Sequence, residues 1–202
     1  NYKLKIKGGE GAGIWEKGAM FRFFQVNRDI FLRTLCLVAV TLFFTSAGAS
    51  QGEIILAVNT LLMQLFTLFS YVMDGFAYAG EALSGRYIGA RNREAFTDTV
   101  RHLFGWGAVI AVLFTLVYAL GGNAFLGLLT DDKEVIAVAD TYFYWALAVP
   151  AVGIAAFIWD GIFIGATATR GMLLSMAAAA VSFFILYYGL HPVLANHALW
   201  LA

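Results

Sequence analysis

Three carboxylates lie in strongly apolar parts of this sequence: Asp74, Glu81 and Asp160. A charged side chain in the middle of a bilayer costs about 3 kcal/mol or more, so acids that are kept there usually face a cavity or a partner. No Lys or Arg lies well inside a predicted span to neutralise them. Arg33, near the start of the first span, is expected to extend to the cytoplasmic interface. Asp74 and Asp160 are therefore candidate groups for binding a substrate or an ion.

Asp74 belongs to a polar face that runs along one predicted helix. At 100° per residue, five polar side chains of this helix fall within about 80° of one another: Asn59, Thr67, Ser70, Asp74 and Glu81. Hydrogen bonds between helices would explain one or two such residues. A polar face of this length is better explained by a helix that lines a water-filled cavity.

Asp160 lies in a stretch rich in apolar and aromatic residues, and Tyr142 and Phe157 share its predicted helix face. An apolar wall with aromatic rings around a single acid is typical of a site for a lipophilic cation. Ordinary helix packing, with the acid bonded to a neighbouring hydroxyl, is the alternative. Because a desolvated carboxylate can hold a proton near neutral pH, we hypothesise that Asp74 or Asp160 couples proton flow to transport.

Glu81 has a different interpretation. It lies near one end of its span, within reach of Arg86 or Arg91, and is predicted to form a structural ion pair, with Arg86 as the first candidate, at the cytoplasmic end of the helix.

The elements that position these groups follow from the composition. Of the 202 residues, 61% are hydrophobic and 13% are charged, whereas a soluble domain has roughly 45–50% apolar and about 25% charged residues. The expected surrounding is therefore lipid, and a net charge of zero does not favour nucleic acid as a partner. We predict an all-α transmembrane bundle with spans at residues 30–49, 54–83, 103–121, 141–166 and 172–190, and a sixth beginning near Ala198.

Basic residues orient this bundle. If the helices alternate in direction, only Lys133 of the 13 Lys and Arg residues lies on one side. Cytoplasmic loops carry an excess of Lys and Arg, so the N-terminal end is predicted to be cytoplasmic in a multi-pass protein of the cell (inner) membrane. The residues on the basic side are Lys3, Lys5, Lys7, Lys17, Arg22, Arg28, Arg33, Arg86, Arg91, Arg93, Arg101 and Arg170.

Two parts of the chain are predicted. Residues 1–29 are interpreted as a cytoplasmic linker, and residues 30–202 as the transmembrane bundle. Within the linker, residues 14–28 mix aromatic and basic side chains over a length too short to span a bilayer, which favours a helix lying in the membrane interface. An ordered cytoplasmic linker is the alternative. Since the chain begins with Asn and its last apolar run is short, we expect it to be an excerpt of a longer protein.

Two stretches resemble the signatures of a transporter family. They are DGFAYAGEALSGRYIGAR, from Asp74, and WDGIFIGATATRGM, from Trp159. Both are similar to second-lobe motifs of multidrug and toxic-compound extrusion (MATE) transporters of the DinF-like subgroup. The resemblance implies the C-terminal lobe, truncated at its end, of a twelve-helix transporter that exports organic cations in exchange for H⁺ or Na⁺. Its implied partners are membrane lipid and the N-terminal lobe of the same protein. Some relatives carry an acid in the seventh span, whereas residues 30–49 have none.

Other functional classes fit the residues less well. A related flippase-type exporter of lipid-linked or other amphipathic substrates should carry more buried Arg and Lys to hold phosphates. An enzyme should show a motif such as HExxH or GxSxG in a span; neither occurs, and the three histidines lack metal-ligand spacing. A non-transporting structural subunit would not need a polar face with two buried acids. The sequence therefore predicts a secondary active multidrug efflux transporter, with no enzymatic activity and no cofactor besides H⁺ or Na⁺ as the coupling ion.

Overall fold

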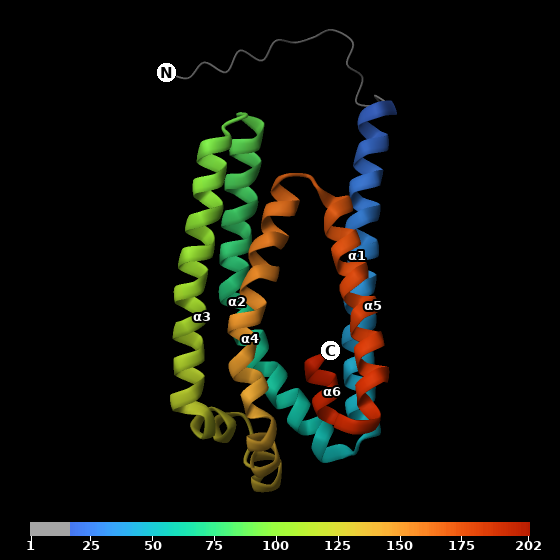
Figure 1. Ribbon diagram of the computed structural model, residues 1–202, viewed down its shortest axis with the longest axis vertical. Coiled ribbons are helices and arrows are strands. Elements are labelled where there is room, and N and C mark those ends of the chain that lie inside the picture. The colour runs from blue at the N-terminus through green and yellow to red at the C-terminus, as the bar shows by residue number, and fades with distance from the viewer. Residues whose placement is uncertain (1–16) are drawn as a thin grey trace.

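The computed structural model describes residues 17–202, which form six α-helices (Figure 1). The helices are α1 (Lys17–Ser50), α2 (Glu53–Gly89), α3 (Arg93–Leu129), α4 (Lys133–Gly165), α5 (Thr169–Leu194) and α6 (Asn196–Leu201). The first five are long and apolar enough to cross a membrane. This confirms the predicted all-α transmembrane bundle. Residues 1–16 of the predicted linker lie outside the described part of the chain.

The five long helices alternate in direction. Figure 1 shows the start of α1, the α2–α3 turn and the α4–α5 turn at one end of the molecule, and the α1–α2 and α3–α4 connections at the other. Lys133, the first residue of α4, is therefore at the opposite end from the Arg residues of the α2–α3 turn. The alternation on which the predicted orientation depends is confirmed, while the assignment of the basic end to the cytoplasm stays a prediction.

The outer surface of the bundle is apolar. Leu120 on α3 is 89% exposed, and Val152 on α4 and Val193 on α5 are likewise exposed. In water such side chains would form large apolar patches, which monomeric soluble proteins rarely show. In a bilayer they contact acyl chains, while the helices satisfy their own backbone hydrogen bonds. The chain is a multi-pass membrane protein.

A few residues determine where the helices begin. Gly52, just before α2, has a φ of 116°, a backbone conformation that other residues rarely adopt. The side chain of Asn92 caps α3 by accepting a hydrogen bond from the backbone N–H of Ala95 at 3.0 Å. Asp132 caps α4 in the same way, with the N–H of Glu134 at 2.9 Å. These side chains pair N–H groups that have no partner within the first turn.

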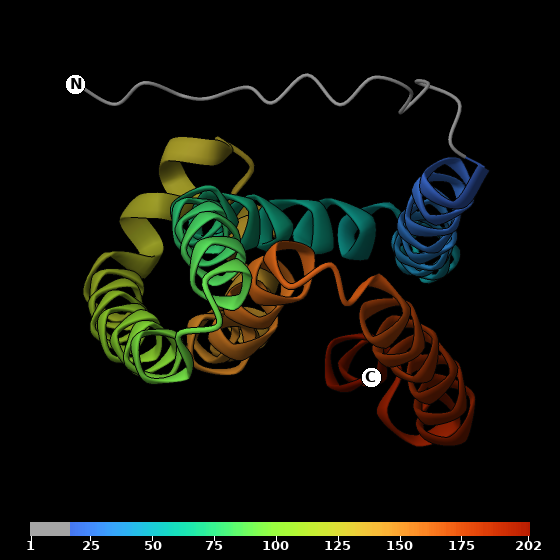
Figure 2. The ribbon, with the colours of Figure 1, turned by 90° about the horizontal axis from the view of Figure 1, so that it is seen from above.

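The helices pack as two groups of three, which lie next to each other when seen from above (Figure 2). One group is α2, α3 and α4, whose shared core includes Leu62, Tyr118 and Ile158. The other is α1, α5 and α6, whose core includes Ala47 and Phe183. The α1–α2 and α4–α5 turns connect the two groups.

Glycines bring α2 and α4 into backbone contact. Gly161 lies directly against the backbone of Ala77, and Gly165 lies against Ser84, so that a side chain at either glycine would overlap α2. The two glycines are four residues apart, which is the small-xxx-small spacing that allows membrane helices to approach closely. Because Gly161 directly follows Asp160 on α4, this contact places that stretch of α4 beside α2.

The first span begins earlier than the sequence predicts. Residues 17–29 continue without interruption into α1, and the apolar section of this helix runs over Phe23–Ser50 rather than starting at residue 30. Asp29 is therefore part of the span. The placement of residues 17–28 in the membrane interface stays a prediction.

Candidate substrate and ion site

Asp160 of α4 forms an ion pair with Arg33 of α1. The two side chains are partly buried, with 28% of the Asp160 side chain and 21% of the Arg33 side chain exposed. The expectation that Arg33 extends to the interface and leaves Asp160 without a basic partner is therefore wrong. Hydropathy reports only how deep each residue lies along its own span, and the contact depends on how α1 and α4 are rotated toward each other.

The ion pair lines an apolar groove of about 480 Å³ between α1, α4 and α5. Pockets for small molecules typically measure roughly 300–1,000 Å³ and combine apolar walls with a few polar groups. A low-dielectric wall also strengthens the attraction between a carboxylate and a cation. Besides the ion pair, the lining consists of Trp159, Phe163, Met172, Ser175, Met176 and the alanines Ala155, Ala156 and Ala179.

Two further carboxylates lie close to Asp160. The charges of Asp74 and Glu81, both on α2, are near enough to interact with it. Within the described residues, neither of these two side chains forms an ion pair or a side-chain hydrogen bond. When all are ionised, three carboxylates and the single guanidinium of Arg33 give this region a formal charge of −2. Such an excess of negative charge in an apolar surrounding attracts cations.

Glu81 does not pair with Arg86. The guanidinium carbon of Arg86 lies 5.7 Å from the centre of the Tyr87 ring, and no ion pair joins Arg86 to Glu81 in this structured region. The two residues are five apart on α2, which separates their directions by about 140°. Side chains that meet on a helix are three or four residues apart.

Asn59 has its polar atoms bonded inside the protein. Its Nδ2 donates to Oδ1 of Asn196 at 2.8 Å, while its Oδ1 accepts from Nδ2 of Asn196 at 3.0 Å and from Nε1 of Trp200 at 2.9 Å. The side chain is almost fully buried. These three bonds join α2 to α6, so in this structure Asn59 is a packing residue rather than a free binding group.

Thr67 and Ser70 are bonded within α2. The Thr67 hydroxyl donates to the carbonyl of Met63, and the Ser70 hydroxyl donates to the carbonyl of Thr67, each at 2.8 Å. Thr67 nevertheless lines a second groove of about 280 Å³ between α1 and α2, together with Asn59 and Met63. Asp74 and Glu81 do not line this groove, so the predicted polar face is divided between two places.

Sequence reasoning missed the other polar residues of this second groove. They are Thr41 and Thr45 of α1 and Thr60 and Gln64 of α2. Thr41 and Thr45 are four residues apart, so their shared helix face could have been found by the same test that was applied to α2.

Tyr142 and Phe157 do not form the wall around Asp160. The Tyr142 ring lies 4.6 Å from the ring of His197, and the Phe157 ring packs against Phe69 in the core between α2 and α4, at 6.0 Å. The aromatic wall consists instead of Trp159 and Phe163.

Comparison with known proteins now identifies the family. The family model described as MatE matches residues 30–190. The chain belongs to the MatE family of multidrug and toxic-compound extrusion transporters. DNA damage-inducible protein F of Escherichia coli (strain K12) is 42% identical over 202 residues, which cover 98% of this chain and 44% of that protein. Protein DETOXIFICATION 45, chloroplastic, of Arabidopsis thaliana is 26% identical over 133 residues, 66% of this chain and 24% of that protein.

A third relative agrees with these two. Protein DETOXIFICATION 42 of Arabidopsis thaliana is 22% identical over 149 residues, 72% of this chain and 29% of that protein. The chain thus spans less than half the length of the curated relatives it matches. No solved structure gives a significant match.

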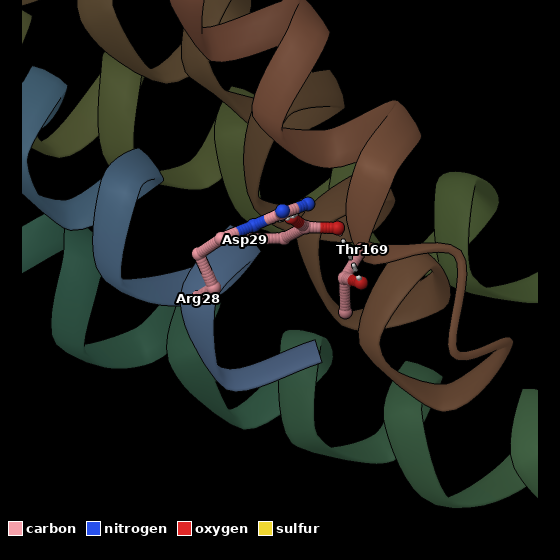
Figure 3. A network of polar contacts seen from close by, with 3 residues as sticks. All are labelled: Arg28, Asp29 and Thr169. Atoms are coloured by element: carbon pink, nitrogen blue, oxygen red, sulfur yellow. Dashed lines mark hydrogen bonds and ion pairs between the residues drawn. The ribbon is translucent and has the colours of Figure 1, made fainter. Parts of the chain in front are cut away.

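The first span of this MatE chain carries its own acid, Asp29, which was predicted to lie in the cytoplasmic linker. Asp29 is 1% exposed, and its Oδ1 accepts two hydrogen bonds from Arg28, at 2.9 and 3.2 Å. Its Oδ2 accepts from the hydroxyl of Thr169 at 3.4 Å. Figure 3 shows this carboxylate directed from α1 toward the first residue of α5. The signal for this buried acid was its position four residues before Arg33, on the same face of α1.

Proposed function

We propose that this chain is the second lobe of a secondary active multidrug transporter, which exports organic cations in exchange for H⁺ or Na⁺. One observation carries the proposal: the Arg33–Asp160 ion pair lines an apolar groove in the membrane-spanning region, and the charges of Asp74 and Glu81 act on the same acid. The MatE family of the chain supports it. A structural membrane subunit has no need for this excess of negative charge, which is costly in lipid.

Asp160 is proposed to hold the cationic part of the substrate. It lines the groove together with Trp159 and Phe163, whose ring faces can attract a cation within about 6 Å. Met172 and Met176 provide polarizable surface that adapts to ligands of different shape. This lining suits a range of lipophilic cations better than one particular compound.

Asp74 is proposed to bind the coupling ion. It has no ion-pair or side-chain hydrogen-bond partner among the described residues, and its charge interacts with that of Asp160. Like charges at short range disfavour one another, so a proton or Na⁺ at Asp74 and a cation at Asp160 influence each other's binding. In the proposed arrangement the basic end of the bundle faces the cytoplasm and the protein resides in the inner membrane.

Efflux by the full-length protein that contains this chain tests the proposal. The protein is expressed in cells that lack their own exporters, and ethidium accumulation is measured with and without a proton uncoupler. We expect the wild type to lower accumulation, and Asp74→Asn and Asp160→Asn each to reduce efflux at least about tenfold, as loss of a charge at a binding site commonly does.

Asp131→Asn is the matched control, because Asp131 is an exposed acid in the α3–α4 connection. It should export ethidium like the wild type. Unchanged efflux in the Asp74→Asn/Asp160→Asn double variant would contradict the proposal, as would a wild type that lowers accumulation equally well in the presence of the uncoupler and without a Na⁺ gradient.

A further inference from the structure

The acid that a cationic substrate would need is already occupied by a cation of the protein itself. Arg33 pairs with Asp160 inside the groove. Removing one partner from a buried ion pair is strongly unfavourable if the other charge is left without compensation. An incoming cation therefore gains access to Asp160 only if Arg33 has another carboxylate to pair with.

Asp29 is placed to be that carboxylate. It precedes Arg33 by four residues on α1, and an acid followed by a base at this spacing is the favourable orientation for an ion pair along a helix. Among residues 17–202, its Oδ2 is engaged only by the 3.4 Å contact with Thr169. Its Oδ1 is held by Arg28, whose side chain is 62% exposed and can turn toward the polar interface. A carboxylate has about four acceptor positions, so Asp29 can accept a second guanidinium.

We propose that Arg33 is a built-in competitor for the cation site, and that a substrate cation binds Asp160 by displacing the Arg33 guanidinium to Asp29. Asp160 and Asp29 each have a cationic partner before and after binding. Before binding, Arg33 neutralises Asp160 and Arg28 neutralises Asp29; after binding, the substrate neutralises Asp160, Arg33 neutralises Asp29 and Arg28 is in contact with water.

This proposal rests on the proposed function, since it assumes that Asp160 receives a cation. It adds a physical reason why the groove would select some cations over others. A ligand must compete with a planar guanidinium, so weakly bound monovalent cations are excluded and those with large apolar surface for the groove are favoured. Asp74 and Glu81 also act on Asp160, but they lie on α2, whereas Asp29 is on the same helix as Arg33.

Equilibrium binding of tetraphenylphosphonium to the full-length protein in nanodiscs tests the competition. Arg33→Gln removes the competitor, so we expect binding about tenfold tighter than in the wild type. Asp29→Asn removes the second acceptor, so displacement becomes harder and binding about tenfold weaker. The double variant Arg33→Gln/Asp29→Asn should bind as tightly as Arg33→Gln alone, since Asp29 matters only when Arg33 has to move.

Thr169→Val separates this role from a structural one. It removes the Thr169 contact to Asp29 while both charges remain, and should bind like the wild type. If it weakens binding as much as Asp29→Asn does, the acid acts by holding α1 to α5 and the proposal is wrong. The proposal is also overturned if Asp29→Asn weakens tetraphenylphosphonium binding equally in the wild type and in the Arg33→Gln variant.

Arg33→Gln tests the competition by itself, including the case in which the Asp29 variants fail to fold. Unchanged tetraphenylphosphonium affinity in this variant overturns the competition, and the proposed function survives if the wild type still exports ethidium. Tighter binding in Arg33→Gln combined with no efflux by the wild type would support the competition and contradict the proposed function.

Discussion

Replacing Asn59 by leucine should destabilise the protein by about 2–3 kcal/mol, because it breaks the polar contact between α2 and α6. Asn59 exchanges two hydrogen bonds with Asn196 and accepts a third from Trp200. Leucine has the same number and branching of side-chain heavy atoms as asparagine, so the substitution leaves no empty cavity. The loss in stability comes from the remaining partners. The Asn196 amide loses both a donor and an acceptor, and the Trp200 N–H loses its acceptor.

The magnitude follows from the number of broken bonds. Hydrogen bonds between membrane helices contribute about 0.6 kcal/mol each on average, which gives about 2 kcal/mol for three. A buried polar group without any partner costs about 1–3 kcal/mol. Asn196 is 1% exposed and becomes such a group, which raises the expected loss toward about 3 kcal/mol.

Reversible unfolding of the full-length protein in mixtures of dodecyl sulfate and a mild detergent measures this loss. Asn196→Leu should cost a similar amount. The double variant Asn59→Leu/Asn196→Leu should cost clearly less than the sum of the two single variants, because it leaves neither amide without its partner. The reasoning is refuted if Asn59→Leu costs less than about 0.5 kcal/mol, or if the two losses are additive.

Two further predictions concern helix packing and orientation. Gly161→Ala places a methyl group against the α2 backbone and should destabilise the protein by about 1–3 kcal/mol in the same unfolding measurement. Gly75→Ala is the control, because its new methyl group meets open space, and it should not destabilise the protein. Equal effects of the two variants would contradict the close α2–α4 contact. In a Cys36→Ser background, a cysteine replacing Ala90 in the α2–α3 turn should react with a membrane-impermeant maleimide only after the cells are permeabilised. A cysteine replacing Asp131 in the α3–α4 connection should react in intact cells, because these two connections lie at opposite ends of the bundle. The reverse pattern would invert the predicted topology.

The helices were largely predictable because each one satisfies a local condition. A span needs about 20 apolar residues whatever its neighbours are. Four of the five predicted spans lie inside the long helices, and the fourth span, 141–166, passes the end of α4 by one residue. The boundary of the first span was the exception. Residues 23–29 contain two charged, two other polar and two aromatic side chains. This mixed composition resembles a membrane interface more than a span, so the sequence did not indicate that Asp29 is buried.

The candidate site was predictable only in part. Asp160 and Asp74 were found because charges in apolar runs are conspicuous, and they do lie near each other. The wall around Asp160 was assigned to Tyr142 and Phe157 because they share its face on an ideal helix, but each ring packs against a different helix. Which part of a helix face is a groove and which part is a contact depends on the neighbouring helices.

Sequence alone therefore determined the class of protein, the number and alternation of its long helices, and the acids that are expensive to keep in lipid. These properties depend on transfer free energies and on spacing along one helix, which are local. The tertiary structure decided the partners: Arg33 for Asp160, Thr169 for Asp29, and Asn196 for Asn59. The members of the last two pairs are 140 and 137 residues apart in the sequence, and only the packing of α1, α5 and α6 beside α2 and α4 brings them together.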